Sequence, residues 1–286
     1  MRNNKKATIA AIQTAVSRNK DANLEKTIRM VKGAAKKGAK IICLQELFSS
    51  VYFPQEKKAV FEKYSDTIPG ELTKRFSELA RKLGVIIILP LFEKAKDGHY
   101  YNSAVVINEK GKLLDTYRKI HIPYDERYYE KNYFKEGNKG YKVFKTKFAD
   151  FAVLICYDQW FPEAARMAAL AGAEIIFYPT AIGTIIGDKD NYGDWHDAWE
   201  TVQRGHAIAN SVNVVAVNRV GREDKINFWG QSFVSDAFGK VIKRANAKKD
   251  ETMIAKLDLG LNKHIRKEWG FFTNRRPDTY KLHSKK

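Results

Sequence analysis

Apolar residues recur along the chain in an order that alternates helices with buried strands. In the first unit, Leu24, Ile28 and Val31 fall on one face of a predicted helix. Gly38 ends this helix, and the apolar run KIICLQE (residues 40–46) follows as a strand. The pattern therefore predicts a helix whose apolar face covers a buried sheet.

The same order of helix and strand recurs three times further along the chain. The predicted helices, each with the strand that follows it, are 72–83 with 85–92, 162–172 with 174–179, and 195–210 with 212–218. Helices that alternate with nearly continuous apolar strands are typical of an α/β protein whose sheets are covered by helices.

Two further segments alternate apolar and polar residues and predict antiparallel strands. Residues 100–119 form two such runs around a turn at 109–111, and residues 233–243 repeat the pattern around Phe238-Gly239. The sheet is therefore expected to be mixed. Since no Ser-, Gly- or Pro-rich linker divides the chain, we expect one domain over residues 1–286, with a polar tail from about residue 260.

Composition adds one unusual property, a net charge of +18 from 51 basic and 33 acidic residues. Such a charge raises the alternative of a basic nucleic-acid-binding protein. The lysines are scattered, however, and no basic helix, zinc-finger spacing or RNP-like run occurs, so a solvated lysine-rich surface is the favoured interpretation. No apolar run reaches the roughly 20 residues of a membrane helix, and we expect a soluble, cytoplasmic protein.

The two cysteines, Cys43 and Cys156, cannot build a disulfide framework in 286 residues, and both are expected as reduced thiols. Cys43 lies inside an apolar strand and is interpreted as core. Cys156 instead closes the run FAVLIC just before a polar break and the helix that begins at Pro162. In α/β sheets the carboxyl ends of strands carry ligand sites, which makes Cys156 a candidate for chemistry together with Glu46 and Lys119, each at the end of a predicted strand.

In their sequence context these three residues resemble the Glu-Lys-Cys triad of the nitrilase superfamily, the carbon-nitrogen hydrolases. Glu46 stands in CLQELF, Lys119 in YRKIHIP and Cys156 in ICYDQWFPEAAR. Glu130, in YYEKNYFKEGN, matches a second glutamate near the site of this family. The resemblance continues through EIIFYPTAIG, FWGQSFVSDAFG and NRRPDTY, in the order of the family and over nearly the whole chain.

The resemblance implies a four-layer α-β-β-α sandwich with two mixed β-sheets. It also implies that subunits pair through their helical faces into a homodimer or larger homo-oligomer. No cofactor and no metal are expected, because the six histidines show no ligand spacing. Residues expected to bind the substrate or to support the triad are Glu130, Tyr157, Gln159, Trp160, Thr180 and Ala181.

Chemistry explains why these residue types belong together. A thiol is mostly protonated at neutral pH, so Cys156 needs a base such as Glu46, which can afterwards protonate the departing amine. Lys119 suits the negative charge that develops on the attacked carbonyl oxygen, aided by the backbone N–H of Tyr157. Loss of one such donor typically raises a barrier by about 3 kcal/mol.

The stretch after Cys156 bears on the substrate. Relatives that hydrolyse N-carbamoyl amino acids generally place an arginine there, whereas this chain has Asp158, Gln159 and Trp160. We therefore expect an amine-ended substrate, N-carbamoylputrescine, cleaved to putrescine, carbon dioxide and ammonia. N-carbamoyl-β-alanine or an N-carbamoyl amino acid is the alternative, since Arg166, Arg204 or Arg127 could supply a carboxylate clamp from elsewhere. Acidic and aromatic side chains that could hold an amine are Asp188, Asp190, Asp194 and Asp197, with Tyr192 and Trp195.

Two other chemistries stay open at this point. A papain-like Cys-His pair could involve His121 or His206, although His206 is favoured as a hydrogen-bonded core residue and His121 as a residue that positions the YRKIHIP turn. A superfamily member could also transfer its acyl group to an acceptor other than water. Amine-dependent product formation would reveal that activity.

Overall fold

The computed structural model of the chain describes residues 5–188 and 193–280. Its first sheet is mixed, because strands β1, β2 and β3 run parallel whereas the other neighbours pair antiparallel. In sheet order the strands are β15 (Glu251–Asp258), β1 (Lys6–Gln13), β2 (Ile41–Leu44), β3 (Ile86–Lys94), β4 (Tyr100–Ile107) and β5 (Leu113–Arg118). The antiparallel pair β4–β5 confirms the hairpin predicted over residues 100–119.

The second sheet has the same character, with a parallel centre and antiparallel flanks. Its order is β14 (Val241–Arg244), β13 (Phe233–Ser235), β10 (Asn213–Val217), β8 (Ile175–Pro179), β7 (Asp150–Val153) and β6 (Val143–Lys145). The parallel strands are the short apolar runs of the sequence, as buried strands covered on both faces require.

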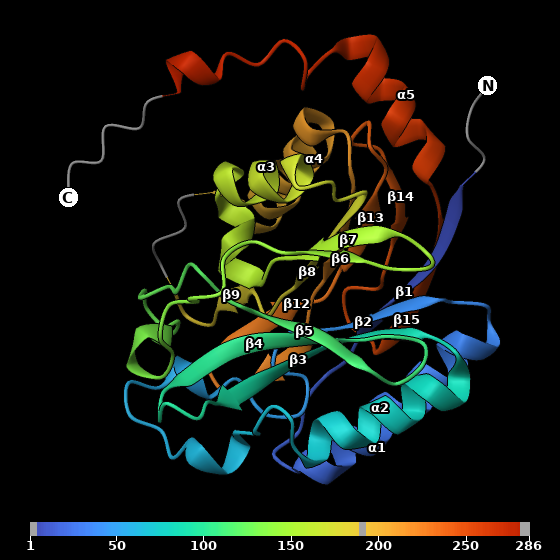
Figure 1. Cartoon of the computed structure of the whole chain (residues 1–286). Coiled ribbons are helices and arrows are strands. Elements are labelled where there is room, and N and C mark those ends of the chain that lie inside the picture. Colours follow the sequence, from blue (N-terminus) through green and yellow to red (C-terminus); the bar gives the residue numbers. More distant parts are fainter. Residues whose placement is uncertain (1–4, 189–192, 281–286) are drawn as a thin grey trace.

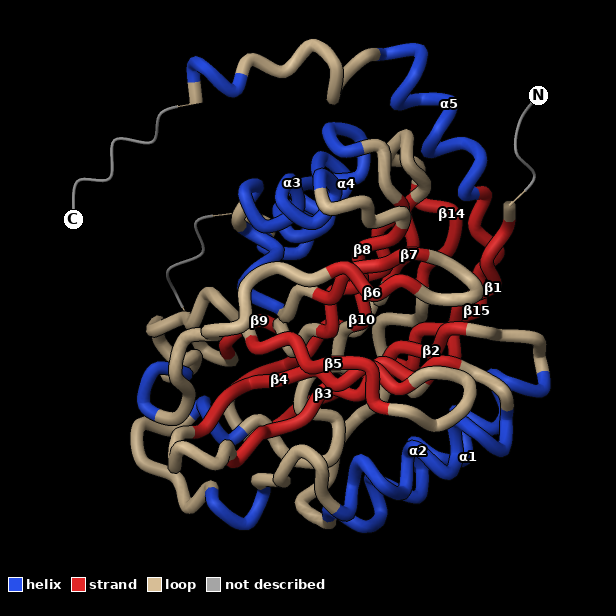
Figure 2. The backbone as a smooth tube through the Cα atoms, viewed as in Figure 1, coloured by secondary structure: helices blue, strands red, loops and turns tan. Residues whose placement is uncertain are grey.

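Helices cover the outer face of each sheet (Figure 1). The pair α1 (Lys20–Lys36) and α2 (Glu71–Leu83) packs on the first sheet, and α3 (Pro162–Leu170) with α4 (Trp195–Asn210) packs on the second. The side chain of Asn19 caps α1, and Gly84, at φ +64°, ends α2 in the left-handed conformation that glycine adopts without strain. The fold is thus the expected α-β-β-α sandwich, and the two stacked sheets are visible in Figure 2.

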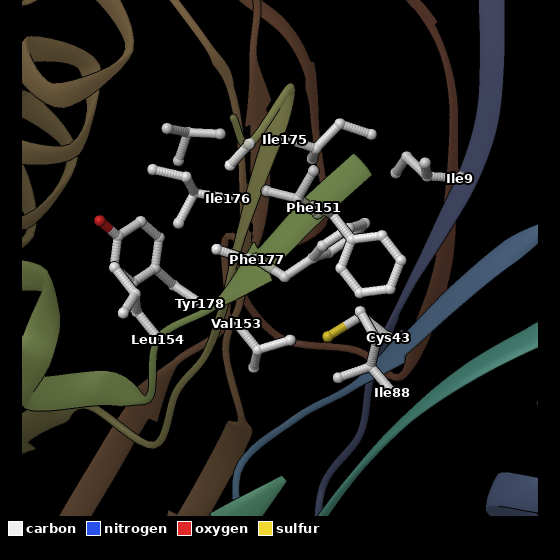
Figure 3. Close-up of a cluster of buried hydrophobic side chains, with 14 of the residues drawn as sticks. Ile9, Cys43, Ile88, Phe151, Val153, Leu154, Ile175, Ile176, Phe177 and Tyr178 are labelled. Atoms are coloured by element: carbon white, nitrogen blue, oxygen red, sulfur yellow. The ribbon is translucent and has the colours of Figure 1, made fainter. Parts of the chain in front are cut away.

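The space between the sheets is filled by apolar side chains from both of them. Ile9, Cys43 and Ile88 of the first sheet meet Phe151 and Phe177 of the second (Figure 3). All five are fully buried. The two sheets therefore share one core, which fixes the position of one sheet's strand ends relative to the other's.

Several elements were not predicted. One of these is strand β15, which pairs with β1. Its buried residues Met253, Ala255 and Leu257 alternate with less buried ones, as expected for a strand. A small third sheet contains β9 (Gly183–Ile185), β12 (Ile226–Trp229) and β11 (Val220–Glu223). The segment expected as a polar tail instead begins with helix α5 (Leu259–Trp269). The short 3-10 helices are η1 (Phe53–Gln55), η2 (Glu62–Tyr64), η3 (Glu130–Asn132), η4 (Cys156–Trp160) and η5 (Pro277–Thr279).

Candidate active site

The residues singled out as chemistry-bearing lie just beyond strands rather than on their last positions. Strand β2 ends at Leu44, two residues before Glu46, and β7 ends at Val153, three residues before Cys156. The expectation that these strands end on the reactive residues is therefore wrong in detail. Only Lys119 follows its strand, β5, directly.

The nucleophile candidate sits at the start of a tight turn. Cys156 is the first residue of η4 and has φ +44°, a left-handed conformation that is uncommon for a residue with a side chain. The carboxylate of Asp158 holds this turn, because it accepts a 2.9 Å hydrogen bond from the backbone N–H of Ile155. Such a sharp turn between a strand and a helix fixes the direction of the thiol and separates it from the sheet.

Lys119 lies between two glutamates in a fully buried cluster. Its Nζ donates at 3.0 Å to Oε1 of Glu46 and at 2.6 Å to Oε2 of Glu130. All three side chains are inaccessible to solvent. A lysine has three N–H donors, so this geometry commits two of them to the carboxylates and leaves the third for a further acceptor.

Two residues that the sequence did not single out complete the cluster. Nδ2 of Asn102, on β4, donates at 2.7 Å to the same Glu46 oxygen that Lys119 contacts. The hydroxyl of Tyr52 donates at 2.6 Å to Oε1 of Glu130. Among the described residues the second oxygen of Glu46, Oε2, has no hydrogen-bond partner. In the sequence Asn102 is one of the polar positions of a run that alternates polar and apolar residues, so nothing local distinguishes it.

A close backbone contact places Lys119. The N–H of Gly137 donates at 2.8 Å to the carbonyl of Lys119, and a Cβ at position 137 would lie 2.1 Å from the carbonyl oxygen of Arg118. Only glycine permits this approach. The glycine of the KEGN sequence thus serves to pack one loop against the lysine.

Burial and charge together set the protonation of the cluster. Burial raises the pKa of the Cys156 thiol well above its ordinary value, and Glu46 raises it further, while Lys119 and a backbone hydrogen bond from Ala181 act in the opposite direction. Burial likewise raises the pKa of Glu130 to about 7, although Lys119 opposes this. The resting thiol is therefore protonated, and its attack on a carbonyl requires a base.

Burial by itself lowers the pKa of Lys119, but the charges of Glu130 and Glu46 outweigh it and raise the pKa above that of a free lysine. The ammonium group is thus held charged in a site without solvent. A fixed positive charge of this kind can stabilise an oxyanion without reorganisation.

Cys156 lines a cavity of about 460 Å³, and the buried Glu130 lies in the wall of this cavity. The cavity wall includes Tyr157, Gln159 and Trp160, three of the residues expected to contact the substrate. Thr180 is fully buried behind it, where its hydroxyl donates to Gln159 at 3.2 Å, and Ala181 supports the thiol through its backbone. The volume suits a small molecule of the size of an amino acid or a short amine.

The rim of this cavity carries acidic side chains. Asp125, Glu126 and Asp188 are among its lining residues, and none of the described residues that line it is an arginine. Asp188 and Trp195 also line an adjoining cavity of about 600 Å³, and Asp194 is a further lining residue of that second cavity. Asp125 and Glu126 were missed because their loop shows no pattern by itself.

The remaining acidic residues and the arginines have other partners. Asp194 caps helix α4 by accepting from the N–H of Asp197, and Asp190 and Tyr192 lie outside the described residues. Arg204 donates to the carbonyl of Gly239. The two other arginines are Arg127, which pairs with Glu126 and Glu56, and Arg166, which stacks over Phe272.

Both histidines of the papain-like alternative are engaged elsewhere. His206 is buried, and its Nε2 lies 2.9 Å from the carbonyl oxygen of Gln159, as predicted for a core histidine. Nδ1 of His121 lies 2.7 Å from Asp158, and its ring stacks on Phe161. Cys43 is fully buried between the sheets, as expected for a core thiol (Figure 3).

Comparison with known proteins gives one consistent result. A family model described as carbon-nitrogen hydrolase matches residues 8–267. The chain is 43% identical over 288 residues to an N-carbamoylputrescine amidase of Solanum lycopersicum, covering 98% of this chain and 95% of the relative. It is 40% identical over 278 residues to a citrullinase of Francisella tularensis, covering 95% and 96%. A carbon-nitrogen hydrolase from Helicobacter pylori G27 has a solved structure that superposes with a TM-score of 0.91 at 38% identity, covering 96% of this chain and 97% of that one.

Proposed function

Because the chain belongs to the carbon-nitrogen hydrolase family, we propose that it hydrolyses N-carbamoylputrescine to putrescine, carbon dioxide and ammonia. Within this proposal Cys156 is the nucleophile, Glu46 moves protons and Lys119 stabilises charge. The observation that carries the choice of substrate is the cavity beside Cys156, whose described wall includes the carboxylates of Asp125 and Asp188 and no arginine. The carboxylate of Glu126, also in this wall, is paired with Arg127. Carboxylates favour an ammonium group at the far end of the substrate and disfavour a carboxylate there.

In the first half of the reaction the sulfur of Cys156 attacks the carbamoyl carbon, and Glu46 takes the thiol proton. The unpartnered Oε2 of Glu46 is the acceptor that supports this role. The carbonyl oxygen becomes negative and accepts hydrogen bonds from the third N–H of Lys119 and from the backbone N–H of Tyr157. One C–N bond then breaks, and the amine leaves with the proton that Glu46 returns.

In the second half water attacks the carbamoyl thioester, and Glu46 accepts a proton from it. The C–S bond breaks, the thiol regains its proton, and carbamic acid is released. Carbamic acid decomposes to carbon dioxide and the second amine, so that one water is consumed for each substrate. Glu130 supports this cycle because its carboxylate holds the ammonium of Lys119 at 2.6 Å. The same ammonium also contacts Glu46, at 3.0 Å.

A matched pair of ureido substrates tests the proposal. Citrulline differs from N-carbamoylputrescine by one carboxylate on the carbon that bears the amine. We expect kcat/KM to favour N-carbamoylputrescine over both citrulline and N-carbamoyl-β-alanine by at least about tenfold, measured as ammonia release. A preference for either carboxylate-bearing compound would overturn the substrate assignment but leave the hydrolytic chemistry in place.

We also propose a homodimer or larger homo-oligomer, as the family resemblance implies, and a location in the cytoplasm. Exposed apolar side chains on the outer helices support the oligomer: Met167 and Leu170 on α3, and Ile208 on α4. Light scattering coupled to gel filtration tests the oligomer, and a monomer at micromolar concentration would contradict it.

No helix in the described part of the chain combines the length and apolarity that crossing a bilayer demands.

A further inference from the structure

A buried arginine outside the catalytic cluster grips the backbone that carries Glu46. Arg219 follows β10 and is fully buried. Its Nη2 donates to the carbonyl oxygens of Glu46, at 3.0 Å, and Leu47, at 2.8 Å, and its Nη1 donates to that of Ser50, at 3.1 Å. One guanidinium group thus satisfies three carbonyls of a single turn.

The backbone of this turn adopts a conformation that its surroundings must enforce. Leu47 has φ +48°, a conformation that costs a non-glycine residue free energy and persists only where the surroundings enforce it. The carbonyl of Leu47 also accepts from the backbone N–H of Ser50, at 3.1 Å. The carbonyls of Glu46 and Ser50 have Arg219 as their partner in the interior, where an unsatisfied carbonyl is costly. A planar fork of donors matches this arrangement, whereas the single ammonium of a lysine does not.

A second buried residue, Glu223, connects Arg219 through hydrogen bonds to Glu130, the other glutamate of the cluster. Oε1 of Glu223 accepts from Nη1 of Arg219 at 2.7 Å, and Oε2 of the same carboxylate accepts from the backbone N–H of Tyr52 at 2.7 Å. The hydroxyl of Tyr52 in turn holds Glu130. Arg219 and Glu223 therefore link both carboxylates around Lys119 to the strand pair β11–β12.

We infer that Arg219, held by Glu223, is the positioning residue for the proton-transferring carboxylate of Glu46. It contacts no reacting atom and acts only through the turn that carries Glu46. The inference rests on the proposed function, because it assumes that Glu46 moves protons to and from Cys156. Removing the guanidinium lets the turn relax, and a carboxylate displaced by about 1 Å can lose on the order of a hundredfold in rate.

A double-mutant cycle between Arg219 and Glu46 separates positioning from general structural damage. We expect Arg219→Lys to lower kcat by about tenfold or more with KM changed less than about threefold. In the Glu46→Gln background the same substitution is expected to have no further effect on kcat, because the group that Arg219 positions is already gone. An equal loss in both backgrounds would overturn the inference. Glu223→Gln, a milder change, is expected to follow the same pattern.

Arg266→Lys is the matched control. Arg266 is partly buried and also donates to a backbone carbonyl, that of Ala173 at 2.9 Å, but it belongs to α5. We expect this variant to retain kcat. A loss of kcat as large as that of Arg219→Lys would show that removing an arginine from a backbone carbonyl far from Glu46 affects turnover in the same way, and would overturn the inference.

A readout without substrate keeps this test separate from the choice of substrate. The rate at which iodoacetamide alkylates Cys156, followed by peptide mass, depends on the groups around the thiol. We expect Arg219→Lys to change this rate by about threefold or more with Glu46 present and to leave it unchanged in the Glu46→Gln background. If wild-type protein fails to turn over N-carbamoylputrescine, the proposed function fails, while the alkylation cycle still decides the inference.

Discussion

The hydroxyl of Tyr117 donates a 2.7 Å hydrogen bond to the buried carboxylate of Asp158, joining the last strand of the first sheet to the turn that follows β7 in the second. The same carboxylate accepts from the backbone N–H of Ile155, at 2.9 Å, and from that of His121, at 3.0 Å. Asp158 therefore ties the turn of Cys156 to the segment on both sides of Lys119. This carboxylate thus connects the segments that carry Cys156 and Lys119 across the two sheets.

The Tyr117 contact predicts that two buried tyrosines contribute differently to the free energy of unfolding. Tyr117→Phe removes a hydrogen bond to a charged group and should lower the free energy of unfolding by about 1.5–3 kcal/mol. Tyr178 is equally buried, but its hydroxyl has no hydrogen-bond partner among the described residues, so Tyr178→Phe should cost less. Urea unfolding of both variants checks this, and equal losses would contradict it.

The two cysteines are predicted to respond oppositely to substitution. Cys156→Ala should abolish turnover and the covalent adduct while the circular dichroism spectrum stays that of wild type, because it removes the thiol that we propose as the nucleophile. Cys43→Ala should keep turnover and lower the free energy of unfolding by about 1–2 kcal/mol, since a sulfur leaves the core between the sheets. Intact mass after brief exposure to substrate reports the adduct. Adduct formation by Cys156→Ala would refute the assignment.

Glu130 predicts an unusual pH dependence of stability. Its pKa is raised to about 7 from an ordinary value of 4.5, chiefly by burial, so the folded protein binds this proton more tightly than the unfolded chain does. The stability that this proton contributes is full below about pH 4.5 and declines as pH rises toward 7, by at most about 1.4 kcal/mol per unit. A carboxylate whose pKa is lowered in the folded protein would show the opposite sign.

Glu130→Gln cannot titrate and should lose this part of the slope. Urea unfolding of wild type and variant at pH 5 and pH 7.5 measures it, with the stability of wild type relative to the variant expected to fall as pH rises. A relative stability that instead increases with pH would mean that Glu130 is ionised throughout in the folded protein.

The acidic rim of the cavity predicts that removing one of its charges raises KM only for substrates with an ammonium group. Asp125 is exposed and lines the cavity, so Asp125→Asn should raise KM for N-carbamoylputrescine by about two- to fivefold, as expected for an interaction between exposed charges. Butylurea has the same carbon chain and no ammonium group, and its KM should not change. The effect on N-carbamoylputrescine should shrink in 0.5 M salt. An equal rise in KM for both compounds would point to a change in cavity shape.

How far the sequence could predict the site depends on the range of each signal. Gly84 and the apolar stripe of α2 act within a few residues, and the helix was predicted with its end. Asn102 and Tyr52 contact Glu46 and Glu130 from 56 and 78 positions away in the chain, and no local pattern reports such a contact. Motif resemblance identified Glu46, Lys119 and Cys156, but the positive φ of Cys156 placed it in a turn and not on a strand.

The sequence by itself determined the alternation of helices and strands, the family, and the identities of the thiol, the ammonium and the carboxylates that meet at the site. Hydrophobic period and turn residues encode such features locally, so they can be read without the fold. Only the tertiary structure decided which oxygen of Glu46 stays unpartnered, which carboxylates face the cavity, and that Arg219 holds the turn of Glu46. Those properties arise from burial and from hydrogen bonds between distant segments, which exist only after the two sheets have packed together.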